Sequence, residues 1–548
     1  MAEQDLHSAA FARLDEAHMD SLARCVGAPL TRHKDGQKLI EAGDRDFRFF
    51  VIKSGRIAIQ DDSETPNTIA VLEPGQFTGE VTHLTGGPSP VSAVAQGDVD
   101  AYEVSADGLR EIINRFPNVG DIVMQAFIAR REILRECDEF DGLSVIGSRY
   151  SKDTFRIRVF LAENQILFRW LDLEADPHVA QLLKQFGVDE ADTPVVRWSR
   201  RFLLRNPSNR ELAETLGIRQ PLKQTAYDLV VVGAGPAGLA AAVYGASEGL
   251  STVLLESAGP GGQAGRSMRI ENYLGFPTGI TGGELAERAV LQAGKFGARL
   301  LVATQVAGLT FENAYAQLHL DGGETVLGKC LLIATGAEYR RLDAAGRERF
   351  EGCGVFYAAT PVEAPICRGA EVVVVGGGNS AGQAAVYLAG IARKVDLVIR
   401  ADNLYKDMSA YLARRIEETA NIEILLNTVV QRMLGNGHLG AIELVDNKTG
   451  QTRTINTPAL FSFIGAAPRS DWLPPEIEKD AKQFVRTGPT LAQSSHWNAR
   501  RQPFLLETSH PGVFASGDVR AGSTKRVASA VGEGAMAVQF VHEYLKEM

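Results

Sequence analysis

Two stretches of this 548-residue chain have residue types and spacing that suit the binding of a dinucleotide. In the first, the apolar run DLVVV leads into Gly233, Gly235 and Gly238, and an alanine-rich helix is expected directly afterwards. The first glycine permits a tight turn, the second lets the backbone approach a pyrophosphate, and the third allows close helix-to-strand packing. The start of the helix also offers backbone amides to the anion.

An acid at the end of the next strand indicates which dinucleotide the first stretch binds. The run STVLLE ends in Glu256, 18 positions after Gly238. A carboxylate at this place accepts hydrogen bonds from the ribose hydroxyls of an unphosphorylated adenosine. Strand, turn, helix, second strand and acid in this order predict an FAD site.

The second stretch, EVVVVGGGNSAGQAAVYLAG from residue 371, repeats the strand, turn and helix. Gly376, Gly378 and Ala381 take the three small-residue positions, and Asn379 and Ser380 complete the turn. The same physical reasoning applies, so we expect a second dinucleotide here.

The residue after the following strand favours a phosphorylated ligand at the second site. Arg400 stands where an NAD site usually carries an acid, and a guanidinium binds a ribose 2′-phosphate in fork geometry. This favours NADPH over NADH. Arg414 or Arg415 is the expected source of a second cation.

The five cysteines do not form a redox or zinc motif. No two of them are spaced as C-x-x-C, which is the pattern typical of dithiol centres and of most zinc sites. They are Cys25, Cys137, Cys330, Cys353 and Cys367. We therefore expect neither a catalytic thiol nor a metal site.

Beyond the two turns, further segments resemble the thioredoxin-reductase family of FAD- and NAD(P)-dependent pyridine nucleotide-disulphide oxidoreductases. These segments are GGQ from residue 261, ENY from 271, ATG from 334, GAAP from 465 and FASGDVRAGSTKRVASAVGEGA from 514. The resemblance implies that Asp518 holds the ribityl chain and that the helix from Val527 lies beside the flavin, where its amides stabilise negative charge.

The resemblance assigns residues to both cofactors. For FAD they are Gly233, Gly235, Pro236, Ala237, Gly238, Glu256, Gly262, Gln263, Asn272, Ala334, Gly336, Gly517, Asp518, Arg526, Val527 and Ala528. For NADPH they are Gly376, Gly378, Asn379, Ser380, Ala381 and Arg400.

The sequence departs from that family at its redox centre. The stretch VFYAATPVEAP puts Ala358 and Pro361 at the two cysteine positions, and neither side chain carries electrons. A disulfide between Cys353 and Cys367 is the remaining alternative for a thiol centre in this region, although their separation is not the family's motif. The catalytic residues of a dithiol relay are absent from their usual place.

These features predict hydride transfer from NADPH to FAD and then directly to an external acceptor. Acceptors of suitable chemistry are a quinone, an iron-sulfur or flavin protein, and dioxygen. One alternative is a sensor, in which the flavin module changes how the other domains bind a partner. Another is a thioredoxin-disulfide reductase that uses thiols from elsewhere in the chain or from a partner.

Residues 1–140 predict a small β-barrel or jelly roll with flanking helices. The triplet from Lys53 to Gly55 is predicted to be a hairpin turn, and one helical stretch is expected from Asp107 to Glu139. The segments IEAGDRDFRFFVIKSGRIAI and FTGEVTHLTGGPSPVSA resemble the cyclic-nucleotide-binding domain.

The loop that would hold a cyclic nucleotide is only partly preserved. Gly79, Glu80, Gly86 and Pro88 match the family's loop, but Ser89 occupies the position of the arginine that holds the phosphate. We expect a barrel retained for packing, dimerisation or an unknown ligand, and we keep cyclic-nucleotide sensing as the alternative.

Residues 141–222 predict a small α/β domain in which strands and helices alternate. It resembles the glutaredoxin and thioredoxin fold, in which the Thr193–Pro194 peptide bond would be cis. Its active cysteines are missing, because residues 147–152 read GSRYSK. We expect a structural spacer or docking surface, with a partner-binding groove as the alternative.

The whole chain is therefore predicted to be a multidomain α/β protein whose FAD domain, residues 226–340 and 466–548, is split by an NAD(P) domain at 341–465. The formal net charge of −10 argues against a nucleic-acid partner. No apolar run approaches the roughly 18 residues of a membrane span, and no leader pattern opens the chain. We expect a cytoplasmic homodimer.

Overall fold

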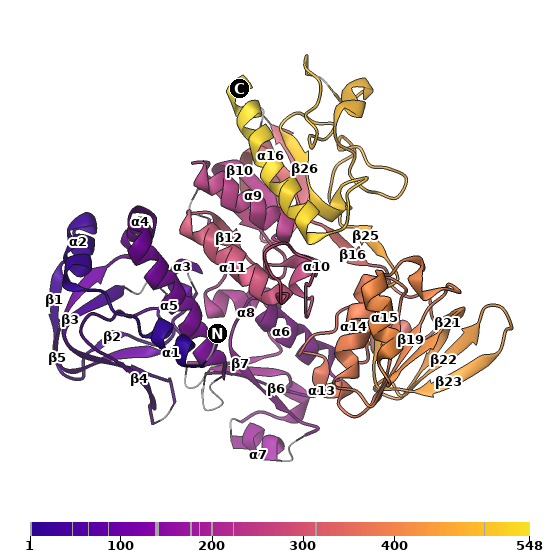
Figure 1. The fold of residues 1–548 in the computed structure, drawn as a ribbon, viewed down its shortest axis with the longest axis horizontal. Helices are drawn as coiled ribbons and strands as arrows, with labels where there is room; N and C mark the ends of the chain where they lie inside the picture. Colours follow the sequence, from indigo (N-terminus) through magenta and orange to yellow (C-terminus); the bar gives the residue numbers. More distant parts are fainter. Residues whose placement is uncertain are drawn as a thin grey trace.

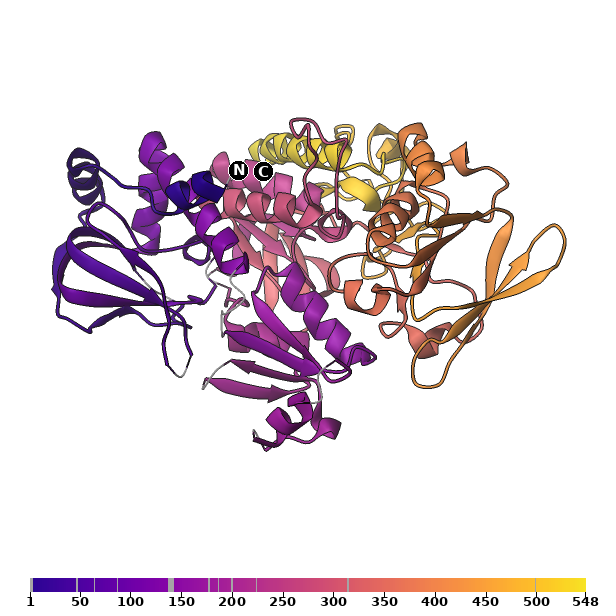
Figure 2. The same ribbon diagram turned by 60° about the horizontal axis from the view of Figure 1, so that its bottom comes forward.

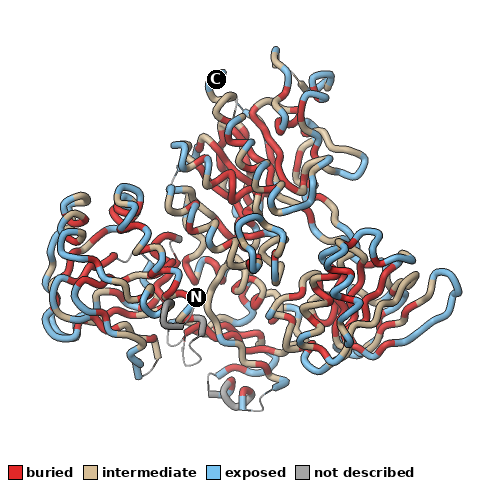
Figure 3. Tube along the Cα trace, viewed as in Figure 1, coloured by how far each residue is buried: buried red, intermediate tan, exposed pale blue. Residues whose placement is uncertain are grey.

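The computed structural model describes residues 3–45, 48–63, 65–85, 87–136, 142–175, 178–185, 187–198, 201–222, 224–312, 315–497 and 499–548. The chain forms several lobes, with the N-terminal sheet at one end and the lobe that contains β19 (Lys394–Val398) at the other (Figure 1). Each lobe has a buried interior of its own (Figure 3). Cys137 and Gly86 lie outside the described residues.

The N-terminal lobe, called the barrel lobe here, is an antiparallel sheet flanked by helices. Its sheet has the order β1-β5-β3-β4, with β2 paired to β5. The elements are α1 (Glu3–Ala10), α2 (Glu16–Val26), β1 (Leu30–His33), β2 (Lys38–Ile40), β3 (Phe49–Gln60), β4 (Thr68–Leu72), α3 (Thr82–Thr85), β5 (Ser92–Val104), α4 (Ala106–Arg115) and α5 (Pro117–Glu136).

Two local predictions for this lobe were wrong. The chain does not reverse at Lys53–Gly55, because β3 runs through it and its pairing with β5 is irregular at Ser54. Gly55 has a φ of 84°, and a Cβ there would lie 2.4 Å from the Asp98 carbonyl oxygen, so it accommodates a bulge. The expected single helix is divided at Phe116, because Pro117 begins a new helix.

The middle lobe matches the predicted alternation and adds one strand. Its sheet has the order β7-β6-β8-β9, in which β6 and β7 are parallel and the other pairs antiparallel. The extra strand is β9, and the Thr193–Pro194 peptide bond is cis. The elements are β6 (Leu143–Gly147), α6 (Lys152–Glu163), β7 (Phe168–Asp172), α7 (His178–Gln185), β8 (Val195–Trp198), β9 (Phe202–Arg205) and α8 (Asn209–Leu216).

The first dinucleotide lobe combines two segments that lie far apart in the sequence around the parallel strands β12-β11-β10-β15-β26. An antiparallel ribbon of β13 and β14 extends β15. The elements of its core are β10 (Ala226–Val232), α9 (Pro236–Ser247), β11 (Thr252–Leu255), α10 (Gly262–Gly265), α11 (Gly282–Lys295), β12 (Arg299–Leu301), β13 (Val306–Glu312), β14 (Tyr315–Leu320), β15 (Thr325–Ile333), β26 (Val513–Ala515) and α16 (Val527–Glu547).

The second dinucleotide lobe has a parallel sheet of order β17-β24-β18-β19-β20 and an antiparallel sheet of β21, β22 and β23. Its elements include β17 (Val355–Phe356), β18 (Glu371–Val375), α14 (Asn379–Ala389), β19 (Lys394–Val398), α15 (Ala410–Glu418), β20 (Ile422–Leu425), β21 (Thr428–Leu434), β22 (Ala441–Asp446), β23 (Thr452–Asn456) and β24 (Leu460–Ser462).

Two short strands connect the dinucleotide lobes. The chain leaves the first lobe through β16 (Ala337–Tyr339) and returns through β25 (Ala466–Pro468), and these strands pair antiparallel. Both crossings lie side by side, with the middle lobe against the two lobes that they join (Figure 2). The insertion is therefore attached by a narrow two-stranded link.

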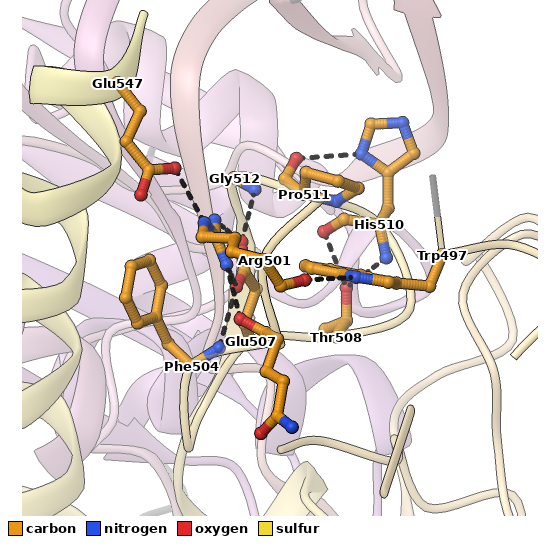
Figure 4. A network of polar contacts seen from close by, with 10 residues as sticks. Trp497, Arg501, Phe504, Glu507, Thr508, His510, Pro511, Gly512 and Glu547 are labelled. Carbon is orange, nitrogen blue, oxygen red and sulfur yellow. Dashed lines mark hydrogen bonds and ion pairs between the residues drawn. The ribbon is translucent and has the colours of Figure 1, made fainter. Parts of the chain in front are cut away.

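A buried ion pair fixes the last segment of the first dinucleotide lobe (Figure 4). The fully buried Glu507 carboxylate accepts hydrogen bonds from both Nη atoms of Arg501, at 2.6 and 2.8 Å, and from the Gly512 amide at 2.9 Å. Arg501 also contacts Glu547 at the end of α16. These contacts anchor β26, which leads into Gly517.

Within the described part of the chain, no helix has both the length and the apolar character that crossing a membrane requires.

Candidate functional site

A single cavity of about 1390 Å³ lies between the two dinucleotide lobes, and both glycine-rich turns line it. From the first lobe, the predicted site residues on its wall are Gly233, Gly235, Pro236, Ala237, Glu256, Gly262, Gln263, Ala334, Gly336, Gly517, Asp518, Arg526 and Val527. From the second lobe they are Gly376, Gly378, Asn379, Ser380, Ala381 and Arg400. Gly238, Asn272 and Ala528 do not line it.

The three glycines of the first turn have different steric roles. A Cβ on Gly233 would lie 2.4 Å from the Ala334 carbonyl oxygen, and one on Gly238 would lie 1.9 Å from the Gly233 carbonyl oxygen. Gly235 has an ordinary φ of −73°, and the nearest atom to its Cβ would be 4.0 Å away, on Gly262. Gly233 and Gly238 therefore serve the fold, whereas Gly235 leaves space beside the cavity.

Glu256 is a buried carboxylate at the end of β11, and it faces the same cavity. Its oxygens accept hydrogen bonds from the backbone amides of Ala234, at 2.8 Å, and Ala258, at 2.9 Å. Burial raises the pKa of Glu256, and the two amides act in the opposite direction. The amides fix its orientation and leave lone pairs for ribose hydroxyls.

The second turn is also held by contacts on both sides. A Cβ on Gly376 would lie 2.6 Å from the Phe463 carbonyl oxygen, so the glycine allows close approach of β24. Asn379 accepts a hydrogen bond from the Ser409 amide at 2.8 Å. Ser380 hydrogen-bonds the hydroxyl of Tyr339, whose pKa is raised by burial. This bond joins the turn to the connecting strand β16.

The cations that line the second site are only partly those predicted from the sequence. Arg400 is exposed, lines the cavity and makes no ion pair with any residue that the structure describes. Neither Arg414 nor Arg415 lines the cavity, and Arg415 instead pairs with Glu271 at 3.2 Å. Lys406, which sequence reasoning missed, does line it. Lys406 ends a 3-10 helix of three residues, Leu404–Lys406, after β19, and so short an element has no periodic pattern that indicates the direction of its side chains.

At the far end of the first lobe, Gly517 and Asp518 line the cavity just before α16 begins at Val527. The Gly517 amide donates to Glu533 at 2.7 Å, so Glu533 already uses this donor. Glu533 also pairs with Arg520. Burial raises the pKa of Asp518. The turn at Gly517 is therefore held by Glu533, in the second turn of α16.

The segment where the resemblance places a dithiol is a turn whose residues do not line the cavity. Neither Ala358 nor Pro361 lines the cavity. The buried Glu363 accepts hydrogen bonds from the amide and hydroxyl of Thr360, at 2.7 and 2.6 Å, and burial raises its pKa to about 7. The guanidinium of Arg158, on α6, donates to the Val362 carbonyl oxygen at 2.8 Å. Helix α6 of the middle lobe therefore contacts this turn.

Helix α6 contacts both dinucleotide lobes. Near its N-terminus, Lys152 donates to the Glu348 carbonyl oxygen at 2.8 Å, and the rings of Phe155 and Phe356 lie 5.0 Å apart. At its C-terminus, Glu163 pairs with Arg266 of the first lobe at 2.6 Å. The helix thus bridges the lobes beside the cavity that separates them.

The described cysteines are free thiols, and they lie outside the cavity. Cys25, Cys330, Cys353 and Cys367 form no disulfide, and none of them lines the cavity. Burial raises the pKa of Cys367 to about 12 and also raises that of Cys353. Buried thiols with raised pKa values are poor nucleophiles. The alternative of a Cys353–Cys367 disulfide was wrong.

The comparisons with known proteins agree with this geometry. The family model for pyridine nucleotide-disulphide oxidoreductase matches residues 227–534, and the model for the cyclic nucleotide-binding domain matches residues 30–116. The chain belongs to the pyridine nucleotide-disulphide oxidoreductase family.

Relatives of this oxidoreductase include thioredoxin reductases from Bacillus subtilis and Treponema pallidum, each 34% identical. The matches cover 59% of this chain, and 96% and 98% of the two relatives. The crystal structure of Lactococcus lactis thioredoxin reductase in its FR conformation is 28% identical with a TM-score of 0.53, covering 59% of this chain and all of that one. The crystal structure of T. acidophilum thioredoxin reductase also has 28% identity and a TM-score of 0.53, covering 58% of this chain and 99% of that one.

This oxidoreductase is therefore a thioredoxin-reductase-like, FAD-dependent NAD(P)H enzyme whose cofactors are FAD and NADPH. The residues present fit these groups. The space beside Gly235, the buried carboxylate of Glu256 and the unpaired cation Arg400 are the features that a pyrophosphate, a ribose and a 2′-phosphate require.

Substitution of Gly235 by valine separates cofactor binding from folding. The backbone there suits any residue and the side chain meets only the cavity, so we expect a folded protein. FAD affinity should fall at least about tenfold, equivalent to ~1.4 kcal/mol. The measurement is FAD content after gel filtration, together with circular dichroism.

Gly532→Ala is the matched control, because Gly532 is exposed in α16 and no atom lies within 4 Å of a Cβ there. It should retain full FAD content. Full FAD retention by Gly235→Val would show that the pyrophosphate does not approach this turn.

Proposed function

We propose that this protein transfers electrons from NADPH through FAD directly to an external acceptor, without a protein dithiol. The observation that carries the proposal is the turn at residues 358–363, where Ala358 and Pro361 replace the two cysteines and Arg158 contacts the backbone. When bound, the nicotinamide supplies a hydride, and the flavin accepts two electrons and can pass them to a second substrate.

The first lobe would hold FAD through its backbone and two carboxylates. The turn at Gly235 and the start of α9 offer space and amides for the pyrophosphate. Glu256, oriented by two backbone amides, would accept the ribose hydroxyls, and Asp518 would accept a ribityl hydroxyl. The N-terminus of α16 adds a positive dipole end to this wall of the cavity.

The second lobe would hold NADPH through the turn before α14 and a pair of cations. Arg400 and Lys406 both reach the cavity from the segment after β19 and would bind the 2′-phosphate. The backbone from Gly378 to Ala381 would bind the pyrophosphate. Both dinucleotides would then enter one cavity, which is the arrangement that brings their reactive rings together.

We propose the domain boundaries that follow from this assignment. They are 1–140 for the cyclic-nucleotide-binding-like domain, 141–222 for a glutaredoxin-like domain without cysteines, 226–340 and 466–548 for the FAD domain, and 341–465 for the NADPH domain. The acceptor belongs to one of three classes: a quinone, a redox protein or dioxygen.

A sensor is the second candidate, and contacts of the barrel lobe with α11 favour it. Asn114 on α4 donates to the Lys295 carbonyl oxygen at 3.1 Å. Leu291 of α11 packs in the core of the barrel lobe. A change in the barrel would therefore reach a helix of the FAD domain. Slow turnover with every acceptor class, despite rapid flavin reduction, would support this function over an enzyme.

Arg400→Ala tests the choice of nicotinamide. Removing a guanidinium that binds the 2′-phosphate should raise the KM for NADPH about ten- to a hundredfold, since a charged hydrogen bond contributes about 1.5–3 kcal/mol. The KM for NADH should change little. The measurement is stopped-flow reduction of the FAD-loaded protein by each nucleotide without oxygen.

Arg414→Ala is the control for this substitution, because Arg414 is an exposed arginine of α15 outside the cavity. Its nucleotide preference should equal that of the wild type. An Arg400→Ala protein that keeps its preference for NADPH would refute the role of Arg400.

Replacing all five cysteines by alanine tests the direct route. NADPH-driven turnover with a quinone, per bound flavin, should stay within about twofold of the wild type, because no thiol takes part. Circular dichroism and FAD content control for the small cavities left at buried thiols. Loss of turnover with retained flavin reduction would instead support a thioredoxin-disulfide reductase that uses unusual thiols.

A further inference from the structure

A second cavity, of about 60 Å³, lies inside the barrel lobe between its sheet and α5. Most of its wall is aliphatic. Side chains from the sheet and its loops that line it are Ile40, Ile59, Ile69, Leu72, Val91 and Ala93. Gly79, Glu80 and Ser89, the predicted residues of the cyclic-nucleotide-like loop, also line it. The loop therefore lines the cavity, but Ser89 stands at the position where the cyclic-nucleotide-binding family has its phosphate-binding arginine.

A different element supplies a cation to this cavity. Arg130 extends from α5, its Nε donating to the Ala10 carbonyl oxygen at 2.8 Å and its Nη1 to the Gly79 carbonyl oxygen at 2.7 Å. The guanidinium carbon lies 4.8 Å from the centre of the Phe77 ring. The remaining nitrogen, Nη2, is buried and has no hydrogen-bond partner among the residues that the structure describes.

The charge of Arg130 is only partly balanced, by electrostatic attraction to the Glu80 carboxylate. Arg130 forms no ion pair with a described carboxylate, because Glu80 pairs with the neighbouring Arg131 at 3.4 Å and accepts from the Thr82 amide at 3.0 Å. Burial lowers the pKa of Arg130 to about 10, so the side chain remains charged at neutral pH. A buried donor without a partner is costly, and a bound anion would supply the missing acceptor and further balance the charge of Arg130.

We propose that this cavity binds a small apolar monoanion, a short branched carboxylate, whose carboxylate bonds Nη2 of Arg130. The alkyl group would contact the aliphatic wall. Ser89 does not satisfy Nη2, which makes no hydrogen bond to any described residue, and the Ser89 hydroxyl donates to the Val91 carbonyl oxygen at 2.7 Å. The cavity is far smaller than the roughly 300 Å³ at which sites for drug-sized molecules begin. A cyclic nucleotide is therefore not the ligand of this arrangement.

The site adjoins the contact between the barrel lobe and its neighbours. Arg131, next along α5, donates to the Gln165 carbonyl oxygen of the middle lobe, and its Nε lies 4.0 Å from the Glu287 carboxylate of α11. Its Nη1 pairs with Glu80 on the cavity wall. A ligand bound in this cavity should therefore also raise the melting temperature of the full chain.

The test is isothermal titration calorimetry of the full-length, FAD-loaded protein with isobutyrate, inorganic phosphate and cyclic AMP as separate probes. We expect isobutyrate to bind and to raise Tm, with phosphate and cyclic AMP weaker. Arg130→Met, which keeps the aliphatic stem, should weaken isobutyrate binding about ten- to a hundredfold. Arg115→Met, at an exposed position on α4, should bind like the wild type.

Arg130→Lys is the second variant if the methionine protein does not fold. It keeps the charge but not the fork, so isobutyrate should bind with reduced affinity. No binding of isobutyrate to the wild type, or equal binding to the wild type and the Arg130 variants, would overturn the proposal. Tighter binding of cyclic AMP than of isobutyrate would overturn the assigned ligand class.

Discussion

Hydride transfer needs the two reacting rings in contact, at about 3–3.5 Å, and this requirement determines how the two dinucleotide lobes are arranged. Each lobe places its glycine-rich turn at the carboxyl end of a central parallel strand, β10 or β18. The turns can serve one reaction only if both open into the same cavity, as they do here. The paired strands β16 and β25 set this relation, because both chain crossings pass through them.

The middle lobe adds a second constraint on the same arrangement. Helix α6 is tied to the second lobe through Lys152 and Phe155 and to the first lobe through Glu163. A rotation of one dinucleotide lobe against the other would break contacts at one end of this helix. With no dithiol at residues 358 and 361 to be carried to the flavin, the reaction that we propose does not require such a rotation. The bridging of the two lobes by α6 is therefore consistent with the absence of cysteines at residues 358 and 361.

The residues of the site that belong to a local strand-turn-helix pattern could be predicted from the sequence. Residues that reach a site from a distant segment of the chain could not be predicted. The glycine turns and Glu256 depend on one strand-turn-helix unit, whose spacing is readable in the sequence. Lys406 reaches the cavity from the end of a short 3-10 helix, and Arg130 enters the barrel from α5, 51 residues beyond Gly79, whose carbonyl oxygen it contacts. Gly55 was misjudged for a related reason. A glycine between apolar runs suits a bulge as well as a turn, and only the pairing of β3 with β5 decides.

The most direct test of the central claim is an anaerobic titration of the FAD-loaded protein with NADPH, followed through the visible flavin absorbance. NADPH donates two electrons, and FAD accepts two. If electrons pass directly from the flavin to the acceptor, as we propose, one equivalent of NADPH per FAD should bleach the flavin completely. A requirement for two equivalents would show a second two-electron acceptor within the protein, and it would contradict direct transfer from the flavin.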